Sequence, residues 1–360
     1  MEQKKLLTPF LHQSLPLRNK IIMAPMNRRR ASLDGIPGES MITYYAQRAS
    51  AGLLITDNTL VASNGGEVLN TPAIYNDRQI QAWKKITDAV HAKDGKIFVQ
   101  LVHGGRVGHP SIQNGEALIA PSAIGVQETI HLPDGTYQPM AVPVALKTPE
   151  IPVWVNIFKQ AAINAIHAGF DGVEIHGAHG FLIDQFINPH SNHRTDHYGG
   201  SIENRSRFLL EIVNEVAGAI GKDKTGVRLS PFRALYDLKP YPEELATHQY
   251  ILDELQKINI LYVHFSSEVI NGAQSIPLDF LQDARKRFKN LIIMAGGFTV
   301  KTAEEILQTE LVDLVAFGRL FISNPDLAER IYHNLPLADW DESTFYHGGD
   351  KGYIDYLKVG

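Results

Sequence analysis

Two histidines three positions apart, His176 and His179, follow a short apolar run and are well placed by type to do chemistry. Imidazoles at this spacing can ligate a metal, can donate hydrogen bonds to a carbonyl or nitro oxygen, or can lie on the surface without a chemical role. No carboxylate or third histidine nearby has convincing ligand spacing for zinc. We expect a substrate-binding pair and no metal, although the spacing alone leaves the other two interpretations open.

Glycines and an arginine that end two later apolar runs suit an anion. Gly296 and Gly297 end one run, and Gly318 and Arg319 end the next. Glycines let backbone N–H groups approach an anion, the following helix adds its dipole, and an arginine can hydrogen-bond phosphate oxygens. The alternative is that these glycines only turn a tight loop. We expect a phosphorylated cofactor or substrate.

Gln100 and Arg228 lie on two further runs. A buried arginine often closes an ion pair, and a strand glutamine often bonds only backbone, so neither residue alone is decisive. Together with a phosphate site they suit a planar heterocycle that needs an amide partner and a cation beside an electron-accepting edge. A flavin is such a heterocycle.

The elements that must position these residues follow one pattern, in which eight short apolar runs alternate with segments of helical periodicity. This pattern predicts an α/β fold, a (β/α)8 TIM barrel, whose typical length of about 250 residues leaves roughly 100 for extensions. Such barrels hold their active sites at the carboxyl ends of the strands. We predict a single domain over residues 1–360. The expected strands are 21–26, 53–59, 96–103, 172–176, 226–231, 262–267, 291–297 and 314–319. The expected helices begin near Ser40, Asp77, Pro149, Ser201, Pro242, Pro277, Thr299 and Asn324.

Two extensions are expected outside this pattern. Residues 1–20 precede the first strand and are predicted to form an N-terminal hairpin that closes the barrel floor. Residues 108–147 separate strand three from its helix and contain repeated Pro and Gly. A connection of this length is usually a functional lid or has structure of its own, so we predict a capping insertion.

Composition excludes several classes of protein. The chain has 360 residues, 44% of them hydrophobic, no cysteine and a formal charge of −5, which excludes a disordered chain or a disulfide scaffold. No basic run exceeds Arg28-Arg29-Arg30, so we expect neither nucleic acid nor a membrane as partner. The expected partner is a small-molecule substrate, and a homo-oligomer is allowed. The N-terminal segment lacks an apolar core for a signal peptide, and we expect a cytoplasmic protein.

Ordered motifs along the chain are similar to those of the old yellow enzyme family of FMN-dependent ene-reductases. The resemblance runs from about Leu6 to Tyr356. The matching segments are 19–26, 44–48, 100–103, 176–180, 194–201, 203–205, 227–231, 317–319, 345–349 and 352–353.

The resemblance implies noncovalent FMN and an NADPH or NADH hydride donor. Pro25 and Met26 would line the flavin, Gln100 would pair with its pyrimidine edge, and Arg228 would stabilise negative charge near N1. The phosphate would be held by Gly296, Gly297, Gly318 and Arg319. His176 and His179 would hold the electron-withdrawing group of an α,β-unsaturated substrate, and Tyr353 would border that substrate.

Four residues depart from the family's pattern. Asn27 stands where the family commonly has Thr or Cys near the flavin, and Asn58 replaces a usual Ala or Gly beside it. Val102 replaces a common Trp, which should enlarge the substrate pocket. Phe181 occupies the position of the tyrosine that usually protonates the substrate's α-carbon, and a phenyl ring has no proton to give.

These residues predict an FMN-dependent oxidoreductase that passes hydride from NAD(P)H to an activated alkene, such as an unsaturated carbonyl, a nitro compound or a quinone. Because of Phe181, the alternative within flavin chemistry is a redox-neutral isomerase or a weak reductase. The alternatives from other classes are a cofactor-free phosphosugar-type barrel enzyme, a metal-dependent hydrolase and a non-catalytic binding protein.

Overall fold

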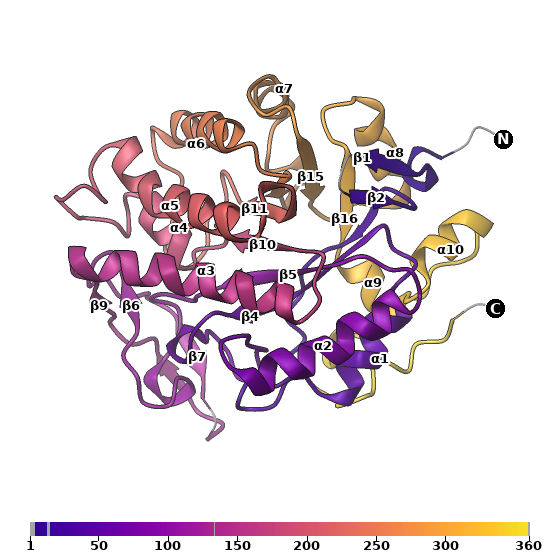
Figure 1. Ribbon diagram of the computed structural model, residues 1–360, viewed down its shortest axis with the longest axis horizontal. Helices are drawn as coiled ribbons and strands as arrows, with labels where there is room; N and C mark the ends of the chain where they lie inside the picture. Colours follow the sequence, from indigo (N-terminus) through magenta and orange to yellow (C-terminus); the bar gives the residue numbers. More distant parts are fainter. Residues whose placement is uncertain (1–3, 13–14, 133, 272, 359–360) are drawn as a thin grey trace.

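Eight parallel strands close into a barrel in the computed structural model, which describes residues 4–12, 15–132, 134–271 and 273–358 (Figure 1). The barrel order is β3-β4-β5-β10-β11-β12-β15-β16, with β16 pairing back onto β3. The bounds are β3 (Ile21–Met23), β4 (Leu53–Leu60), β5 (Ile97–Val102), β10 (Gly172–His176), β11 (Thr225–Leu229), β12 (Tyr262–Ser266), β15 (Leu291–Ala295) and β16 (Leu314–Phe317). The predicted TIM barrel is therefore confirmed.

The strands are nearly continuous apolar runs because both of their faces are buried. Every residue of β4 and β5, for example, is buried. Several strands end earlier than predicted. Strand β15 stops at Ala295 because Gly297 turns into the left-handed region, with φ of 63°. The apolar pattern cannot show where the last ladder hydrogen bond falls.

Helices surround the barrel, and most begin near the predicted residues. Their bounds are α1 (Glu39–Gln47), α2 (Asp77–His91), α3 (Ile151–His167), α4 (Leu182–Ile187), α5 (Ile202–Ile220), α6 (Glu244–Ile258), α7 (Leu278–Arg287), α8 (Val300–Gln308), α9 (Arg319–Ser323) and α10 (Leu327–His333). Helix α5 is capped as predicted, because the Ser201 hydroxyl accepts from the N–H of Asn204. The helix predicted to begin near Asn324 is α10, and the short helix α9 before it was not predicted. Asn324 and Pro325 interrupt two short helices, α9 and α10.

The N-terminal extension forms the predicted hairpin of β1 (Phe10–His12) and β2 (Leu15–Leu17). Residues 1–3 and 13–14 of the predicted segment lie outside the described residues. Leu15 and Leu17 are buried in one apolar cluster with barrel residues such as Leu53 and Leu291. These two barrel residues begin their strands, so the hairpin covers the amino-terminal end of the barrel.

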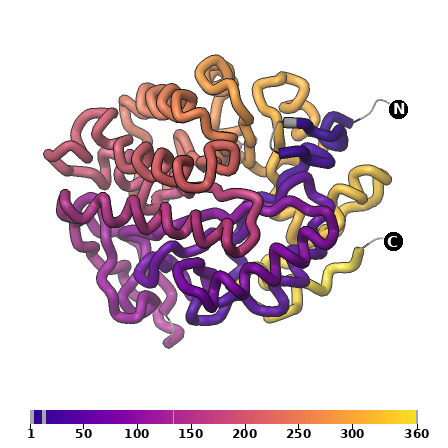
Figure 2. The backbone as a smooth tube through the Cα atoms, viewed as in Figure 1, coloured from indigo at the N-terminus to yellow at the C-terminus, as the bar shows by residue number. Residues whose placement is uncertain are grey.

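The insertion after β5 is structured rather than a simple loop. Short strands β6 (Ile119–Ala120) and β9 (Val144–Ala145) pair in parallel, and β7 (Thr129–His131) and β8 (Tyr137–Pro139) form an antiparallel ribbon. In Figures 1 and 2 the insertion and the N-terminal hairpin lie on opposite sides of the molecule. A further short ribbon, β13 (Val269–Ile270) and β14 (Ala273–Gln274), follows β12.

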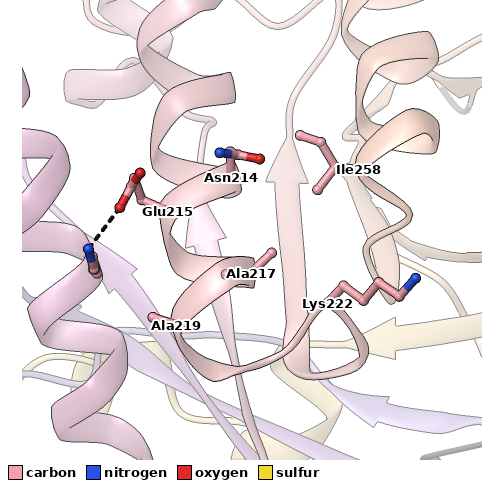
Figure 3. Close-up of a pocket in the computed structure, with 8 residues that line it drawn as sticks. Asn214, Glu215, Ala217, Ala219, Lys222 and Ile258 are labelled. Atoms are coloured by element: carbon pink, nitrogen blue, oxygen red, sulfur yellow. Dashed lines mark hydrogen bonds and ion pairs between the residues drawn. The ribbon is translucent and has the colours of Figure 1, made fainter.

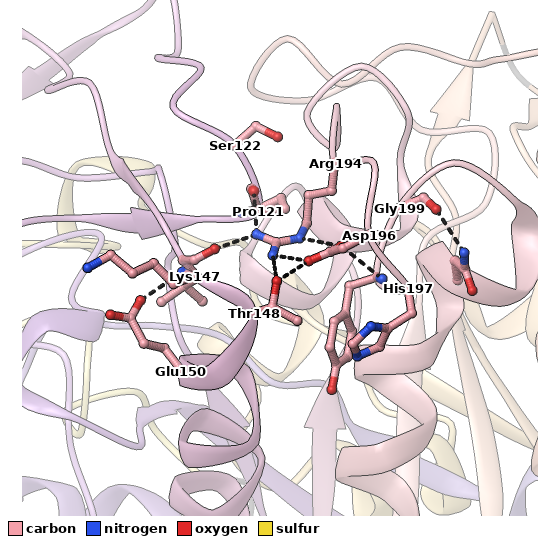
Figure 4. A network of polar contacts seen from close by, with 12 residues as sticks. Pro121, Ser122, Lys147, Thr148, Glu150, Arg194, Asp196, His197 and Gly199 are labelled. Atoms are coloured by element: carbon pink, nitrogen blue, oxygen red, sulfur yellow. Dashed lines mark hydrogen bonds and ion pairs between the residues drawn. The ribbon is translucent and has the colours of Figure 1, made fainter.

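Arg194 fastens the insertion to the segment between α4 and α5 (Figure 4). Its guanidinium donates to the carbonyls of Pro121 and Leu146 and is paired with Asp196, which also accepts from the Thr148 hydroxyl. These contacts hold Asp196 ionised, and the hydrogen bond from Arg194 lowers the pKa of its carboxyl. Arg194 thus has a structural role, because it fixes both ends of the insertion to the segment between α4 and α5.

A cavity of about 530 Å³ lies among the outer helices and is lined by residues of α3, α5 and α6 and by Lys222 (Figure 3). The Lys159–Glu215 ion pair lies beside it. No strand end contributes to it, so barrel chemistry cannot be placed there. Within the described residues, no helix is long and apolar enough to cross a membrane.

Candidate active site

A cavity of about 700 Å³ opens at the carboxyl ends of β3, β11, β12, β15 and β16. This volume is typical of small-molecule and cofactor sites. Eight of the predicted cofactor residues line it together. They are Pro25, Met26, Asn27, Arg228, Gly296, Gly297, Gly318 and Arg319. The fold therefore brings the residues expected to bind phosphate and Arg228, the cation expected beside the flavin, into one cavity.

The end of the cavity at β15 and β16 can receive an anion. A β-carbon on Gly296 would lie 2.5 Å from Gln274 Oε1 and 2.9 Å from Ser267 Cβ, so a side chain does not fit there. Arg319 holds its guanidinium 5.4 Å from the centroid of the Trp340 ring. Among the described residues, no hydrogen bond or ion pair occupies this guanidinium. It is free to bind phosphate oxygens.

Arg228 and His179 meet at Ser266, on the end of β12. The Arg228 guanidinium donates to Ser266 Oγ at 3.2 Å, and His179 Nε2 lies 2.8 Å from the same hydroxyl. Burial lowers the pKa of Arg228 to about 10, so the side chain remains charged at neutral pH. Its Nε is buried without a hydrogen-bond partner in the described part of the chain. A buried, unpartnered cationic donor at the cavity wall calls for an acceptor from a bound molecule.

His176 and His179 lie side by side, with ring centroids 5.1 Å apart. Burial, reinforced by the charge of Arg228, lowers the pKa of both imidazoles well below the usual value. Both rings are therefore neutral at pH 7. His176 Nδ1 accepts from the N–H of Ala178 at 3.3 Å, which leaves the proton on Nε2. This N–H can donate to a substrate oxygen.

Gln100, a predicted cofactor residue, is not among the residues that line the cavity and lies in a buried polar network. It donates to Glu174 Oε1 at 2.7 Å, and Glu174 Oε2 accepts from His264 Nδ1 at 2.8 Å. Burial alone would raise the pKa of Glu174, but His264, Arg228 and the hydrogen bonds outweigh it and lower the pKa. Burial also lowers the pKa of His264. The Glu174 carboxylate, beside the neutral imidazole of His264, therefore provides a negative charge for Arg228 inside the barrel.

Asn27 and Asn58 share one buried acceptor, Glu67. Their amides donate to Glu67 Oε1 at 3.3 Å and 2.5 Å, and Asn27 also donates to Thr71 Oγ1 at 2.8 Å. Burial raises the pKa of Glu67, although the hydrogen bonds from the amides oppose this effect. Two of the four residues that depart from the family pattern, Asn27 and Asn58, thus share one hydrogen-bonded network, although only Asn27 lines the cavity.

Phe181 and Val102 belong to an apolar cluster between the barrel and the insertion, with Val126, Ile130 and Met140 among its members. The Phe181 ring lies 5.0 Å from the His176 ring. Val102 is fully buried and does not line the 700 Å³ cavity, because insertion side chains pack in the same cluster.

The expected substrate contact of Tyr353 needs correction. Tyr353 is fully buried and stacks on Tyr44 with centroids 4.1 Å apart, and the charged group of Arg28 lies 5.3 Å from its ring. The tail tyrosine that lines the cavity is Tyr346, beneath the guanidinium of Arg29 at 4.8 Å. Motif similarity selected the wrong tyrosine because both lie in matching tail segments.

Comparison with known proteins identifies the family. The sequence profile of the NADH:flavin oxidoreductase / NADH oxidase family matches residues 5–338. The chain belongs to the old yellow enzyme family.

Rice 12-oxophytodienoate reductase 7 is 40% identical over 379 residues, covering 100% of this chain and 96% of the relative. A Leishmania infantum protein named as a probable flavin mononucleotide-dependent alkene reductase is 38% identical, over 98% of this chain and 96% of its own. Morphinone reductase in complex with tetrahydroNAD is 42% identical and superposes with a TM-score of 0.93, covering 99% of this chain and 98% of that one. An old yellow enzyme of this kind is an FMN-dependent NAD(P)H oxidoreductase.

The residues present suit FMN. Gly296, Gly297 and the free guanidinium of Arg319 can surround its phosphate. The Nε of Arg228, which has no hydrogen-bond partner among the described residues, can donate to an acceptor on the ring. In the described part of the chain, no three His, Asp or Glu side chains group as metal ligands.

Sequence reasoning missed Ser266, Glu67 and Tyr346. Ser266 could have been found, because it ends the sixth barrel strand, β12, and barrel active sites collect at strand ends. Glu67 and Tyr346 come from a loop and from the tail, where no periodicity indicates what they face.

Proposed function

We propose that this enzyme reduces the C=C bond of an α,β-unsaturated carbonyl, nitro compound or quinone, with noncovalent FMN and with NADPH or NADH as hydride donor. The observation that carries the proposal is the pair of neutral imidazoles, His176 and His179, of which His179 shares the Ser266 hydroxyl with Arg228, the cation of the cofactor cavity. The name of the Leishmania relative, an alkene reductase, agrees with this chemistry.

The chain's residues divide the work. Gly296, Gly297, Gly318 and Arg319 would hold the phosphate of FMN, and Arg228 would lie at its ring. When bound, FMN supplies hydride. His176 Nε2–H donates to the substrate oxygen, and the negative charge that develops there is stabilised by a fixed, desolvated donor rather than by water. A charged imidazole is not needed for this polarisation.

A redox-neutral isomerase is the second candidate, and the surroundings of Phe181 favour it. The ring is 7% exposed, packs on His176 and lies in an apolar cluster, so residue 181 cannot protonate a substrate carbanion. If protonation is slow, the same hydride can return, and the alkene changes position or geometry without net consumption of NAD(P)H.

Two measurements on the purified protein test the proposal. Absorbance of a yellow protein, with FMN released on denaturation, tests the cofactor, and oxidation of NADPH or NADH dependent on 2-cyclohexenone tests the reaction. Stoichiometric consumption of nicotinamide with formation of cyclohexanone is expected. Conversion of the substrate to an isomeric enone, with no consumption of nicotinamide, would establish the isomerase, and a colourless protein would overturn both.

The histidine pair has its own test. Phenols are expected to bind the oxidised enzyme through these imidazoles and to give a long-wavelength charge-transfer band with FMN. Replacing both His176 and His179 by Ala should abolish the band while FMN stays bound, and His333→Ala, on the exposed side of α10, is the matched control. Stoichiometric zinc, with activity lost on chelation, would reassign the pair to a metal.

A further inference from the structure

Tyr236, in the loop between β11 and α6, lies beside the position that lacks a proton donor. Its ring centroid is 6.1 Å from that of Phe181, and the two planes are inclined by 35°. A β-carbon on Gly180 would lie 3.2 Å from Tyr236 Cδ2 and 3.4 Å from its Cβ. Tyr236 therefore packs on the backbone between His179 and Phe181.

Contacts to the insertion fix this tyrosine in place. The Tyr236 carbonyl accepts from the guanidinium of Arg106 at 2.7 Å, and Arg106 also donates to the carbonyl of Ile124 at 3.3 Å. The next residue, Asp237, accepts from the N–H of Gln127 at 2.6 Å. Tyr236 has φ of 51°, a left-handed conformation that these contacts hold. The ring position follows from the fold of the loop and insertion together.

The Tyr236 hydroxyl is not occupied by another protein group in the described part of the chain. Among the described residues it has no hydrogen-bond partner, whereas the Ser266 hydroxyl is already shared by Arg228 and His179. Burial, with smaller effects of Glu67 and Glu128, raises the pKa of Tyr236 to about 12. The phenol therefore keeps its proton throughout the neutral range.

Other tyrosines are less suitable donors. Tyr353 is sealed behind Tyr44 and is fully buried. Tyr346 lies at the cavity mouth, 48% exposed. Of these three tyrosines, Tyr236 is the one that packs on both Phe181 and Gly180, the residue that follows His179.

We propose that Tyr236 Oη is the proton donor to the substrate's α-carbon in this enzyme, in place of residue 181. The inference rests on the proposed alkene reduction. The hydride brings two electrons to the β-carbon and forms the new C–H bond there, while the π pair of the alkene moves toward the oxygen held by His176 and His179. That pair then forms the C–H bond at the α-carbon with the proton of Tyr236, and the tyrosinate takes a proton from water. NAD(P)H supplies the hydride, so the sum is one hydride and one proton added across the double bond.

The kinetic test separates the two half-reactions of the FMN-loaded enzyme. Tyr236→Phe should leave reduction by NADPH unchanged within about 3-fold and slow reoxidation by 2-cyclohexenone by at least about 10-fold, since general-acid help is typically worth roughly 10²–10⁴-fold. Adding Phe181→Tyr to Tyr236→Phe should restore the rate, because it returns a phenol to the neighbouring position. Tyr332→Phe, on exposed α10, is the matched control and should behave as wild type.

A binding measurement tests the placement without turnover. In holoenzyme labelled with fluorotyrosine, the fluorine resonance absent from Tyr236→Phe belongs to residue 236. Cyclohexanone, an inert carbonyl probe, should shift this resonance and leave that of Tyr332 in place.

The outcomes are distinguishable from failure of the proposed function. If wild type is not reoxidised by 2-cyclohexenone, alkene reduction itself is wrong. If wild type is reoxidised and Tyr236→Phe matches it within 3-fold, or if cyclohexanone does not move the resonance, Tyr236 is not the donor. Unchanged FMN content and an unchanged p-cresol charge-transfer band show that the variant is folded with its site intact.

Discussion

The carboxyl group of Asp184 lies next to Gly180, the residue that follows His179. This carboxyl group should make the stability of the protein depend on pH. Its Oδ2 accepts from the N–H of Gly180 at 2.8 Å. Burial raises its pKa to about 7. The hydrogen bond from Gly180 opposes this shift, and the charge of Glu244 adds to it. The folded state therefore binds a proton that the unfolded chain, in which the pKa of aspartate is 3.8, releases at lower pH.

The sign follows from this difference. A group whose pKa is raised by folding contributes its full stability below the unfolded pKa, and that stability is lost as pH rises through the folded value. Between pH 5.5 and 8.5 the loss from Asp184 is about 2 kcal/mol, at 1.36 kcal/mol for each pH unit in the window between the two pKa values. Asp184→Asn keeps an oxygen for Gly180 and removes the ionisation, so the variant should be more stable than wild type at pH 8.5, by about 2 kcal/mol more than at pH 5.5.

Thermal unfolding of the holoenzyme at a fixed excess of FMN measures this effect, because bound ligand also shifts Tm. A change of 1 kcal/mol moves Tm by about 2–4 °C in domains of 150–250 residues, so the difference between variant and wild type should grow by a few degrees from pH 5.5 to 8.5. Asp88→Asn, in an exposed ion pair with Lys84 on α2, is the control. An equal Tm difference at the two pH values would mean that Asp184 is not protonated in the folded state.

Three further changes probe the cofactor cavity and the barrel interior. Arg319→Ala should weaken FMN binding to apoprotein by about 1.5–3 kcal/mol, the value of a charged hydrogen bond, whereas unchanged affinity in a fluorescence titration would remove the phosphate contact. Glu174→Ala leaves buried His264 and Arg228 without their carboxylate and should destabilise the protein in urea by about 3–5 kcal/mol, against less than about 1 kcal/mol for Glu215→Ala in the half-buried pair with Lys159. Gly297→Ala must adopt φ of 63° and approach Val269 Cγ2 at 3.2 Å, so it should cost about 1–2 kcal/mol, and a Tm no lower than that of Gly218→Ala, which meets no atom within 4 Å, would contradict this.

The barrel could be predicted because its strands have a strong local signal. Runs such as that of β15, with every residue buried, are apolar on both faces, and the residues between the runs repeat with the period of a helix. The sequence pattern could not show at which residue each strand or helix ends. The break at Asn324, where the side chain donates to the carbonyl of Ala338, depends on a tail segment 14 residues away.

The site was predictable to the extent that it lies on strand ends. Arg319 and Gly297 follow directly from the rule that barrel chemistry collects at the carboxyl ends. The choice between Tyr346 and Tyr353 could not be made this way. It depends on Arg28, which donates to the carbonyl of Gly352 at 2.8 Å and holds Tyr353 inside the fold. That contact joins positions 324 residues apart.

Neutral histidines separate two tasks that an imidazolium would combine. A charged imidazole could both polarise an oxygen and release a proton, but burial and Arg228 keep His176 and His179 uncharged. A neutral imidazole does not readily give up its remaining proton, so the pair can hold developing charge without quenching it. The proton for the α-carbon must then come from a different group. Phe181 cannot supply it, and the loop that carries Tyr236 is held beside it by Arg106. On the proposed mechanism, reduction or return of the hydride therefore depends on the contact that holds this loop against the insertion.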